Sequence, residues 1–210
     1  MVKIRKYFFL NIRMIEYVTC FCASSNRVDK YYLDAAYELG AILAQNRKTV
    51  IYGGGKVGLM GRLAQGVLDN NGQIIGVIPK FMQKYELGHD GITRLIEVDT
   101  MHQREEMMIS RADCIVALPG GCGTFEELLQ AITWRRLKII SAPVIIVNLK
   151  KYYNPLIQQL NKAVDENFMR AEHRQIWDVA ETVPEVYDLI RAYDSNSRQI
   201  RIMDVQPNIT

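Results

Sequence analysis

Short apolar runs alternate with amphipathic stretches along most of the chain. Six of the runs have the length and composition of β-strands, and they cover residues 16–22, 49–52, 74–79, 94–98, 114–119 and 143–148. Apolar side chains recur at helical spacing over residues 31–46, 59–72, 102–112, 124–138, 152–167 and 184–193. Strands that are apolar along nearly their whole length are typical of a parallel sheet covered by helices on both faces. The pattern therefore predicts an α/β fold, a doubly wound parallel sheet flanked by helices.

No internal repeat or low-complexity linker interrupts this alternation, so we expect one domain over residues 15–193. Residues 1–14 are predicted to be an N-terminal extension, and residues 194–210 a polar C-terminal tail. With 210 residues, of which 49% are apolar and 23% charged, the composition is that of an ordinary globular protein. The apolar run at 7–10 is too short for a signal peptide, and no stretch is long enough to span a membrane. We therefore expect a cytoplasmic protein.

Charge and cysteine content argue against several classes of function. The net charge is only +3, and no dense block of lysine and arginine provides a surface for nucleic acid. The cysteines lack the spacing of a zinc finger; they are Cys20, Cys22, Cys114 and Cys122. Cys20 and Cys22 would point to the same face of a strand, which favours reduced thiols in the core. The 3 histidines also lack ligand spacing, so no metal site is predicted.

Three loops, at residues 23–27, 53–58 and 119–124, follow predicted strands. Ligands of doubly wound sheets bind outside the carboxyl ends of the strands, so all three loops could line one crevice. The loop at 53–58 reads GGGKVG and matches the G-x-G-x-x-G pattern of dinucleotide-binding proteins. The next strand ends without the acidic residue that would bind a ribose, and Leu59 stands where a P-loop needs lysine. Two interpretations remain: backbone N–H groups that bind an anion, or a tight turn.

The loop at 119–124 precedes a predicted helix and contains Gly120, Gly121 and Gly123. Thr124 and Glu127 have the spacing of a capping box, in which Thr124 caps the helix and Glu127 binds the N–H group of the cap. A cap does not need three glycines, which instead indicate close approach of the backbone to a ligand. A carboxylate in the first helical turn is favoured in its charged form. Glu127 would then act as a base, or stabilise a developing positive charge such as a sugar oxocarbenium ion.

Arg104 is a further candidate, at the start of the predicted helix over 102–112. On a helix it shares a face with Met108, while Glu105 points elsewhere. From this spacing alone, an exposed surface arginine is the ordinary interpretation.

Four motifs occur together along the chain: YGGGKVGLMG at 52–61, MHQR at 101–104, LPGGCGTFEE at 118–127 and AITW at 131–134. With these motifs, residues 16–190 resemble the Lonely Guy (LOG) family, whose members were long labelled lysine decarboxylases. The resemblance implies a Rossmann-like fold, a homodimer, and cleavage of nucleoside 5′-monophosphates to free base and ribose 5-phosphate. Plant-type members act on cytokinin nucleotides, and others act on AMP. It implies no metal or organic cofactor, and nothing in the sequence marks a lysine for pyridoxal phosphate.

The functional residues of the family can be carried over position by position. The resemblance implies that the catalytic pair is Arg104 and Glu127. The implied phosphate and ribose contacts are Gly120, Gly121, Gly123, Thr124 and Glu126, with Gly53, Gly54, Gly55 and Ser24 nearby. The implied candidates for contacting the base are Glu86 and Thr133. The candidate residues of a dimer interface are Trp134, Arg135 and Arg136.

Three positions depart from the family pattern and leave the preferred base open. Glu105 replaces the usual lysine after the arginine, Ala23 replaces a glycine of the first loop, and Cys122 replaces a bulky residue. Glu105 also sustains an alternative, a nucleotide-binding or sensing module that has lost turnover. An NAD(P)-dependent oxidoreductase is a further alternative, and it rests only on the G-x-G-x-x-G match.

Overall fold

The computed structural model describes residues 14–82 and 88–195. At its centre lies a seven-stranded sheet in which every neighbouring pair of strands is parallel. The strands are β1 (Tyr17–Phe21), β2 (Thr49–Tyr52), β3 (Ile74–Pro79), β4 (Arg94–Val98), β5 (Cys114–Ala117), β6 (Val144–Val147) and β7 (Trp177–Ala180). The helices are α1 (Lys30–Gln45), α2 (Gly58–Asp69), α4 (Met101–Ser110), α5 (Cys122–Arg136), α6 (Asn154–Asp165) and α7 (Val183–Asp194). The short 3₁₀ helices are η1 (Leu149–Lys151) and η2 (Ala171–Gln175).

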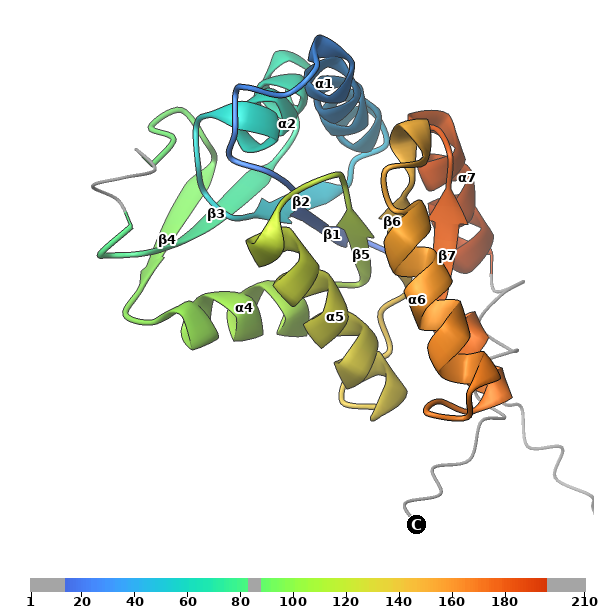
Figure 1. Cartoon of the computed structure of the whole chain (residues 1–210). Helices are drawn as coiled ribbons and strands as arrows, with labels where there is room; N and C mark the ends of the chain where they lie inside the picture. The colour runs from blue at the N-terminus through green and yellow to red at the C-terminus, as the bar shows by residue number, and fades with distance from the viewer. Residues whose placement is uncertain (1–13, 83–87, 196–210) are drawn as a thin grey trace, which may run out of the picture.

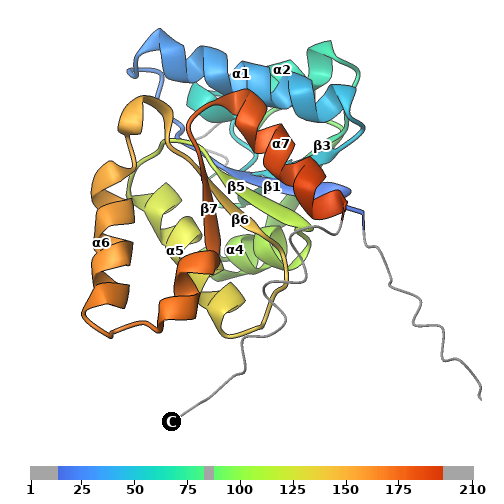
Figure 2. The same ribbon diagram turned by 90° about the vertical axis from the view of Figure 1, so that its right-hand side faces the viewer.

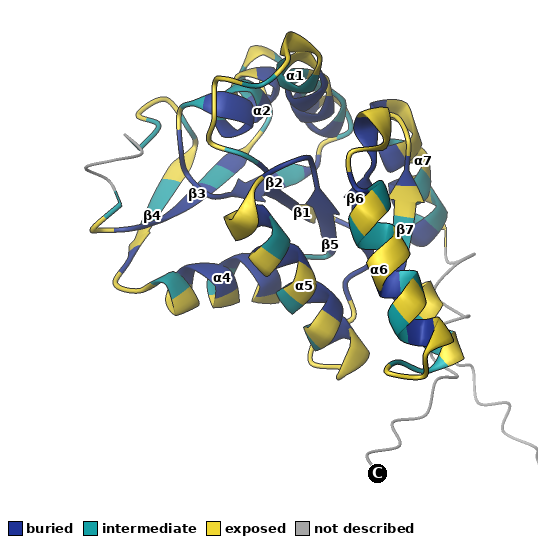
Figure 3. Cartoon of the chain, in the orientation of Figure 1, coloured by how far each residue is buried: buried dark blue, intermediate teal, exposed yellow. Residues whose placement is uncertain are grey.

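Helices cover both faces of the sheet (Figures 1 and 2). Buried side chains of α1, α2 and α7 form one core cluster against the sheet, and those of α4, α5 and α6 form the other. The central strands β5 and β6 are buried along their whole length, whereas the edge strand β4 is largely half-exposed or exposed (Figure 3). The predicted α/β fold, a Rossmann-like doubly wound parallel sheet, is therefore confirmed.

The strand order places a topological switch point between β1 and β5. Across the sheet the order is β4-β3-β2-β1-β5-β6-β7. The chain first builds outward from β1 to β4, and then returns to the other side of β1, where Phe21 pairs with Ala117 of β5. In open α/β sheets ligands bind outside the carboxyl ends of the strands at such a switch point. A ligand-binding site is therefore expected at the loops that follow β1 and β5.

Two elements near the C-terminus differ from the sequence prediction. β7 was not predicted, because Asp178 interrupts the apolar run of its 4 residues. Its strand conformation comes from pairing with β6, in which Val147 lies opposite Ala180. α7 extends to Asp194, the first residue of the predicted tail.

None of the helices in the described ranges has the length and apolarity needed to cross a membrane.

A partly buried ion pair ties the amino edge of the sheet together. Lys48 Nζ, just before β2, lies 2.8 Å from Asp194 Oδ2 at the end of α7. Lys48 Nζ also donates to the carbonyl oxygen of Ile15 at 2.6 Å, and the N–H of Ile15 donates to Asp194 Oδ1 at 2.6 Å. The segment before β1 and the end of α7 are thus joined at the edge of the sheet opposite the switch-point loops.

Candidate active site

The loop after β1 packs directly against the start of α2, the helix that follows β2, at the carboxyl edge of the sheet. The N–H of Met60 donates to the carbonyl oxygen of Ala23 at 3.2 Å, and the N–H of Gly58 donates to Asn26 Oδ1 at 2.7 Å. Gly58 has a φ of +65°, and a Cβ there would come within 2.3 Å of the carbonyl carbon of Ser24. Only glycine fits this position, both for its left-handed backbone and for its contact with the first loop.

Arg104 is buried, and the interpretation of it as an exposed arginine is wrong. Its side chain is only 6% exposed, because α4 turns it toward the ends of β2 and β3. Nε donates to the carbonyl oxygen of Val77 and Nη2 to that of Gly53, each at 3.2 Å. A Cβ on Gly53 would come within 2.1 Å of Nη2, so the first glycine of the 53–58 loop makes room for the guanidinium. The two bonds fix the orientation of a positive charge and use two of its five N–H donors.

Glu127 lies on α5, which follows β5, so it reaches the carboxyl end of β1 from the side opposite to Arg104. Its side chain is 8% exposed. Burial raises the pKa of the Cys22 thiol at the end of β1; the negative charge of Glu127 raises that pKa further, and the positive charge of Arg104 opposes the rise. Both charges therefore act on one thiol, which lies at the switch point. The structure thus brings the predicted pair, Arg104 and Glu127, to opposite sides of the end of β1.

The predicted capping box at the start of α5 is wrong. The helix begins at Cys122, its N-cap is Gly121, and no side chain caps it. Thr124 and Glu127 are therefore the third and sixth residues of the helix, because Cys122 and Gly123 already have helical geometry. Glu127 lies in the second turn, beyond the main reach of the helix dipole. A position in the first turn therefore cannot be the reason that its carboxylate is charged.

The three glycines of the β5–α5 turn (residues 118–121) and of the first turn of α5 serve different purposes. A Cβ on Gly120 would come within 2.1 Å of Thr124 Oγ1, so packing inside the protein explains this glycine. At Gly121 and Gly123 an added Cβ would meet nothing within 4 Å, and neither residue has a positive φ. The expected close approach of a ligand therefore remains as an explanation for Gly121 and Gly123 alone.

The start of α5 offers backbone donors to that open space. The first N–H groups of any helix lack intrahelical partners, and here no side chain replaces them. Gly121, Cys122 and Gly123 are all exposed. Such a terminus is suited to a phosphate or another anion.

For the loop at 53–58, packing and backbone conformation favour the tight-turn interpretation. Gly53, Gly54 and Gly55 are buried, and Gly54 has a φ of +80°. Gly55 also forms an isolated antiparallel bridge with Gly88. These glycines shape the turn that receives Arg104, and a Cβ on Gly53 or Gly54 would come within 3.2 Å of other protein atoms.

The remaining predicted contacts are spread over a wider region. Ser24 and Glu126 are exposed near the two loops. Thr133 lies nine residues beyond Thr124 on α5, about 13 Å along the helix axis, so the structure does not bring it to the glycine turn. Glu86 lies outside the described residues.

Glu105 does not place a reversed charge beside the glycine turn. Its side chain is buried on the side of α4 that faces Glu126 and Gln130 of α5. Burial raises the pKa of its carboxyl, and the neighbouring charge of Glu126 raises it further. The replacement of lysine by Glu105 therefore changes the contact between two helices.

Sequence reasoning missed two tyrosines that hold the β5–α5 turn. Tyr152 Oη donates to the carbonyl oxygen of Gly120 at 2.6 Å, and Tyr153 Oη donates to that of Leu118 at 2.8 Å. Both residues were predicted only as the start of a helix. The available signal was their position, since the two phenol groups follow β6 after only the short helix η1, and β6 pairs with the switch-point strand β5.

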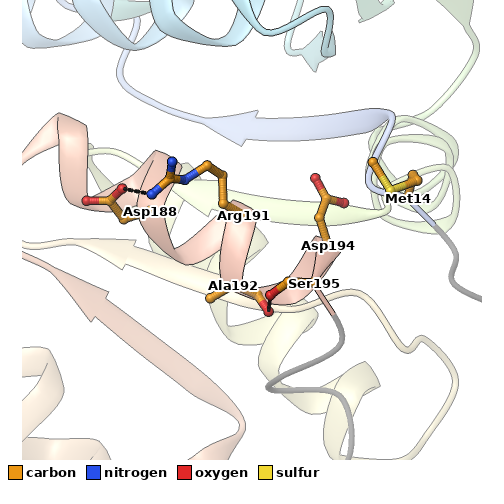
Figure 4. Close-up of a pocket in the computed structure, with 6 residues that line it drawn as sticks. All are labelled: Met14, Asp188, Arg191, Ala192, Asp194 and Ser195. Atoms are coloured by element: carbon orange, nitrogen blue, oxygen red, sulfur yellow. Dashed lines mark hydrogen bonds and ion pairs between the residues drawn. The ribbon is translucent and has the colours of Figure 1, made fainter.

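A surface hollow of about 620 Å³ lies elsewhere, at the amino edge of the sheet (Figure 4). It is shallow and borders both ends of the described chain; its lining residues are Met14, Asp188, Arg191, Ala192, Asp194 and Ser195. Arg191 there pairs with Asp188 at 3.1 Å. Since ligands of this fold bind at the opposite edge, we do not assign the hollow to the site.

The cysteine prediction agrees with the structure. Cys20, Cys22 and Cys114 are buried free thiols, and Cys122 is exposed. Across residues 14–82 and 88–195, no group of three or more His, Cys, Asp or Glu side chains is arranged to hold a metal ion.

Comparison with known proteins identifies the family. Residues 60–190 match the family model described as "Possible lysine decarboxylase". The chain is 40% identical over 183 residues to a probable cytokinin riboside 5′-monophosphate phosphoribohydrolase of Oryza sativa, covering 87% of this chain and 75% of the relative. It is 41% identical over 176 residues to a cytokinin riboside 5′-monophosphate phosphoribohydrolase of Arabidopsis thaliana, covering 84% of this chain and 83% of the relative. The chain therefore belongs to the LOG family.

Solved structures support the fold. The molybdenum cofactor carrier protein of Chlamydomonas reinhardtii superposes with a TM-score of 0.68 at 19% identity, over 87% of this chain and 99% of that one. The molybdenum cofactor binding protein of Rippkaea orientalis gives a TM-score of 0.62 at 20% identity, over 86% and 97% of the two chains. At this identity the likeness concerns the fold alone.

Proposed function

We propose that this chain hydrolyses the N-glycosidic bond of nucleoside 5′-monophosphates and releases the free base and ribose 5-phosphate. Relatives about 40% identical to it are named for this reaction. The observation that carries the proposal is the position of Arg104 and Glu127. Both are nearly buried and both act on Cys22 at the switch point, beside the open start of α5.

The start of α5 binds the 5′-phosphate. Its uncapped N–H groups, at Cys122, Gly123 and Thr124, provide donors and the positive end of a helix dipole. The absence of side chains at Gly121 and Gly123 lets the phosphate oxygens approach the backbone. A phosphate held there fixes the ribose at the end of the sheet.

Glu127 and Arg104 act on the bond that breaks. When the bond between C1′ and the base nitrogen breaks, its electron pair leaves with the base and positive charge develops on the sugar. The Glu127 carboxylate stabilises that charge or deprotonates the attacking water. Arg104, held by two carbonyl oxygens, orients the nucleotide or polarises the departing base. The water oxygen bonds to C1′, and the base acquires a proton.

The substrate is AMP, a cytokinin riboside 5′-monophosphate, or both. The test is to incubate the protein with AMP, isopentenyladenosine 5′-monophosphate and the corresponding nucleosides, and to measure released base by chromatography. We expect base from one or both monophosphates and far less from the nucleosides, which lack the phosphate group. A folded sample that releases no base from either nucleotide would contradict the proposal.

We also propose a cytoplasmic homodimer that associates through α5. The helix exposes Leu129 (39%), and Leu137 (53%) and Ile139 (61%) follow along the same region. Arg135, named above as an interface candidate, is instead buried and donates to the carbonyl oxygen of Ala142 at 2.7 Å. Light scattering of the wild type and of L137E tests the dimer. An unchanged mass for L137E would count against this face.

A further inference from the structure

We propose that Tyr152 is a positioning residue for the phosphate-binding turn. This inference rests on the proposed function, in which the start of α5 receives the 5′-phosphate. Tyr152 does not touch the substrate. It acts through the peptide between Gly120 and Gly121, whose carbonyl oxygen accepts a hydrogen bond from Tyr152 Oη at 2.6 Å.

Because the peptide is planar, the hydrogen bond from Tyr152 to the carbonyl oxygen of Gly120 also restrains the N–H of Gly121. In a trans peptide the C=O and the following N–H point in opposite directions. When the hydroxyl of Tyr152 holds the carbonyl group of Gly120, the N–H of Gly121 is held on the other side of the same plane. That N–H directly precedes the uncapped donors of α5.

The Gly120–Gly121 peptide needs such a restraint more than its neighbours. It is flanked by two glycines, and a residue without a Cβ has the largest range of backbone conformations. The open surface that lets a phosphate approach Gly121 therefore also leaves the peptide free to rotate. On the other side of Pro119, Tyr153 Oη holds the carbonyl oxygen of Leu118 at 2.8 Å, so two phenol groups restrain both ends of the turn.

The two tyrosines are themselves held firmly by buried groups. Asn148, at 2% exposure, accepts from the N–H of Tyr153 at 2.8 Å. Its amide nitrogen donates to Asn154 Oδ1 at 2.9 Å and to Glu181 Oε1 at 3.0 Å. The rings of Tyr152 and Tyr153 meet edge to face, with centroids 5.2 Å apart. These contacts aim the Tyr152 hydroxyl at the turn without help from the ligand.

The surroundings of Tyr152 make its contribution separable from stability. Tyr152 is 40% exposed, whereas Tyr153 is 1% exposed. Water can replace the lost hydroxyl in Y152F as a partner of the carbonyl group, but it cannot restrain the peptide in one orientation. We therefore expect Y152F to fold normally and to bind phosphate less well.

The test compares Y152F with the wild type by base release and by calorimetry with ribose 5-phosphate. We expect the KM for the nucleotide and the Kd for ribose 5-phosphate to rise about three- to tenfold, with kcat and Tm nearly unchanged. The matched control is Y31F, which removes the hydroxyl of an exposed tyrosine. Tyr31 packs against Tyr32, whose ring in turn contacts Tyr152, and no hydrogen bond joins Tyr31 to the turn. Y31F should behave as the wild type.

The outcomes separate this inference from the proposed function. A wild type that neither releases base nor binds ribose 5-phosphate overturns both. A wild type that does both, with unchanged KM and Kd in Y152F, overturns only the role of Tyr152. A third outcome is a lowered Tm of Y152F, with an unchanged KM in the fraction that stays active. This outcome also overturns the positioning role of Tyr152, because the residue would then be purely structural.

Discussion

The amino termini of α4 and α5 lie at the same edge of the sheet, and the protein treats them in opposite ways. At α4, Thr100 accepts from the N–H of Gln103 at 3.2 Å, and the side chain of Gln103 returns to the N–H of Thr100 at 3.3 Å. At α5, Gly121 occupies the N-cap position and provides no side-chain acceptor. The first terminus satisfies its own donors, and the second leaves them for an external acceptor.

This difference shows that the residue at the N-cap decides whether the N–H groups of a helix terminus are available to a ligand. A Thr-x-x-Gln sequence closes the terminus, whereas a glycine N-cap keeps it open at the expense of helix stability. The two helices then divide the chemistry: α4 contributes Arg104 from its first turn, and α5 contributes Glu127 from its second. Four substitutions test this division.

The largest effect is expected for E127Q. The substitution removes the negative charge and retains the size of the side chain, so kcat should fall about 100- to 1000-fold. Base release from AMP or isopentenyladenosine 5′-monophosphate measures it. The control is E106Q, which alters an exposed carboxylate on α4 and should leave kcat unchanged. Wild-type activity in E127Q would remove this residue from the mechanism.

The next effect is expected when α5 is given a cap like that of α4. In G121D the backbone at φ −91° accepts a side chain, and the new carboxylate would occupy the donors and repel phosphate. The KM for the nucleotide should rise about 10- to 100-fold, because hydrogen bonds to a charged group are lost. Thermal stability should stay equal or increase slightly. In G121S, which caps without charge, the rise in KM should be smaller; equal effects would contradict the electrostatic part of the argument.

The reverse change removes the cap of α4. T100A leaves the N–H of Gln103 without its side-chain acceptor, so the free energy of unfolding should fall by about 1 kcal/mol. Urea denaturation measures the change. The KM should remain that of the wild type, since the capped donors of this terminus bond within the protein and are not the groups proposed to bind the phosphate. A parallel rise in KM would show that the two termini are not functionally distinct.

The smallest effect concerns the contact between the two helices. Burial and the charge of Glu126 raise the pKa of the Glu105 carboxyl, while His102, Arg104 and Gln130 oppose the rise. The folded state therefore binds this proton more readily than the unfolded state, and ionisation of Glu105 lowers stability as the pH rises through the raised pKa. E105Q should increase Tm slightly near neutral pH, and the gain should vanish below the ordinary carboxyl range. An equal gain at acidic pH would contradict this explanation.

Periodicity predicted the fold because most strands and helices carry their own apolar pattern. The apolar pattern did not predict β7, because the strand conformation of this segment depends on pairing with β6. The motifs located Arg104 and Glu127, but spacing along a helix could not reveal that the carbonyl groups of Gly53 and Val77 bury Arg104. The N-cap of α5 was placed at Thr124 because a short motif cannot show where helical geometry begins. The role of Tyr152 was missed because its partner, Gly120, lies 32 residues away in the sequence.

The partly buried ion pair between Lys48 and Asp194 has a consequence for how the chain can be rearranged. Because it holds the segment before β1 against the end of α7, Met14 and Ser195 line one and the same hollow (Figure 4). A short linker between these two residues would close the described chain into a ring, and new termini could open in the exposed turn around Asn71. Such a circular permutant should keep its nucleotide chemistry, since the seam lies at the edge of the sheet away from the glycine turn.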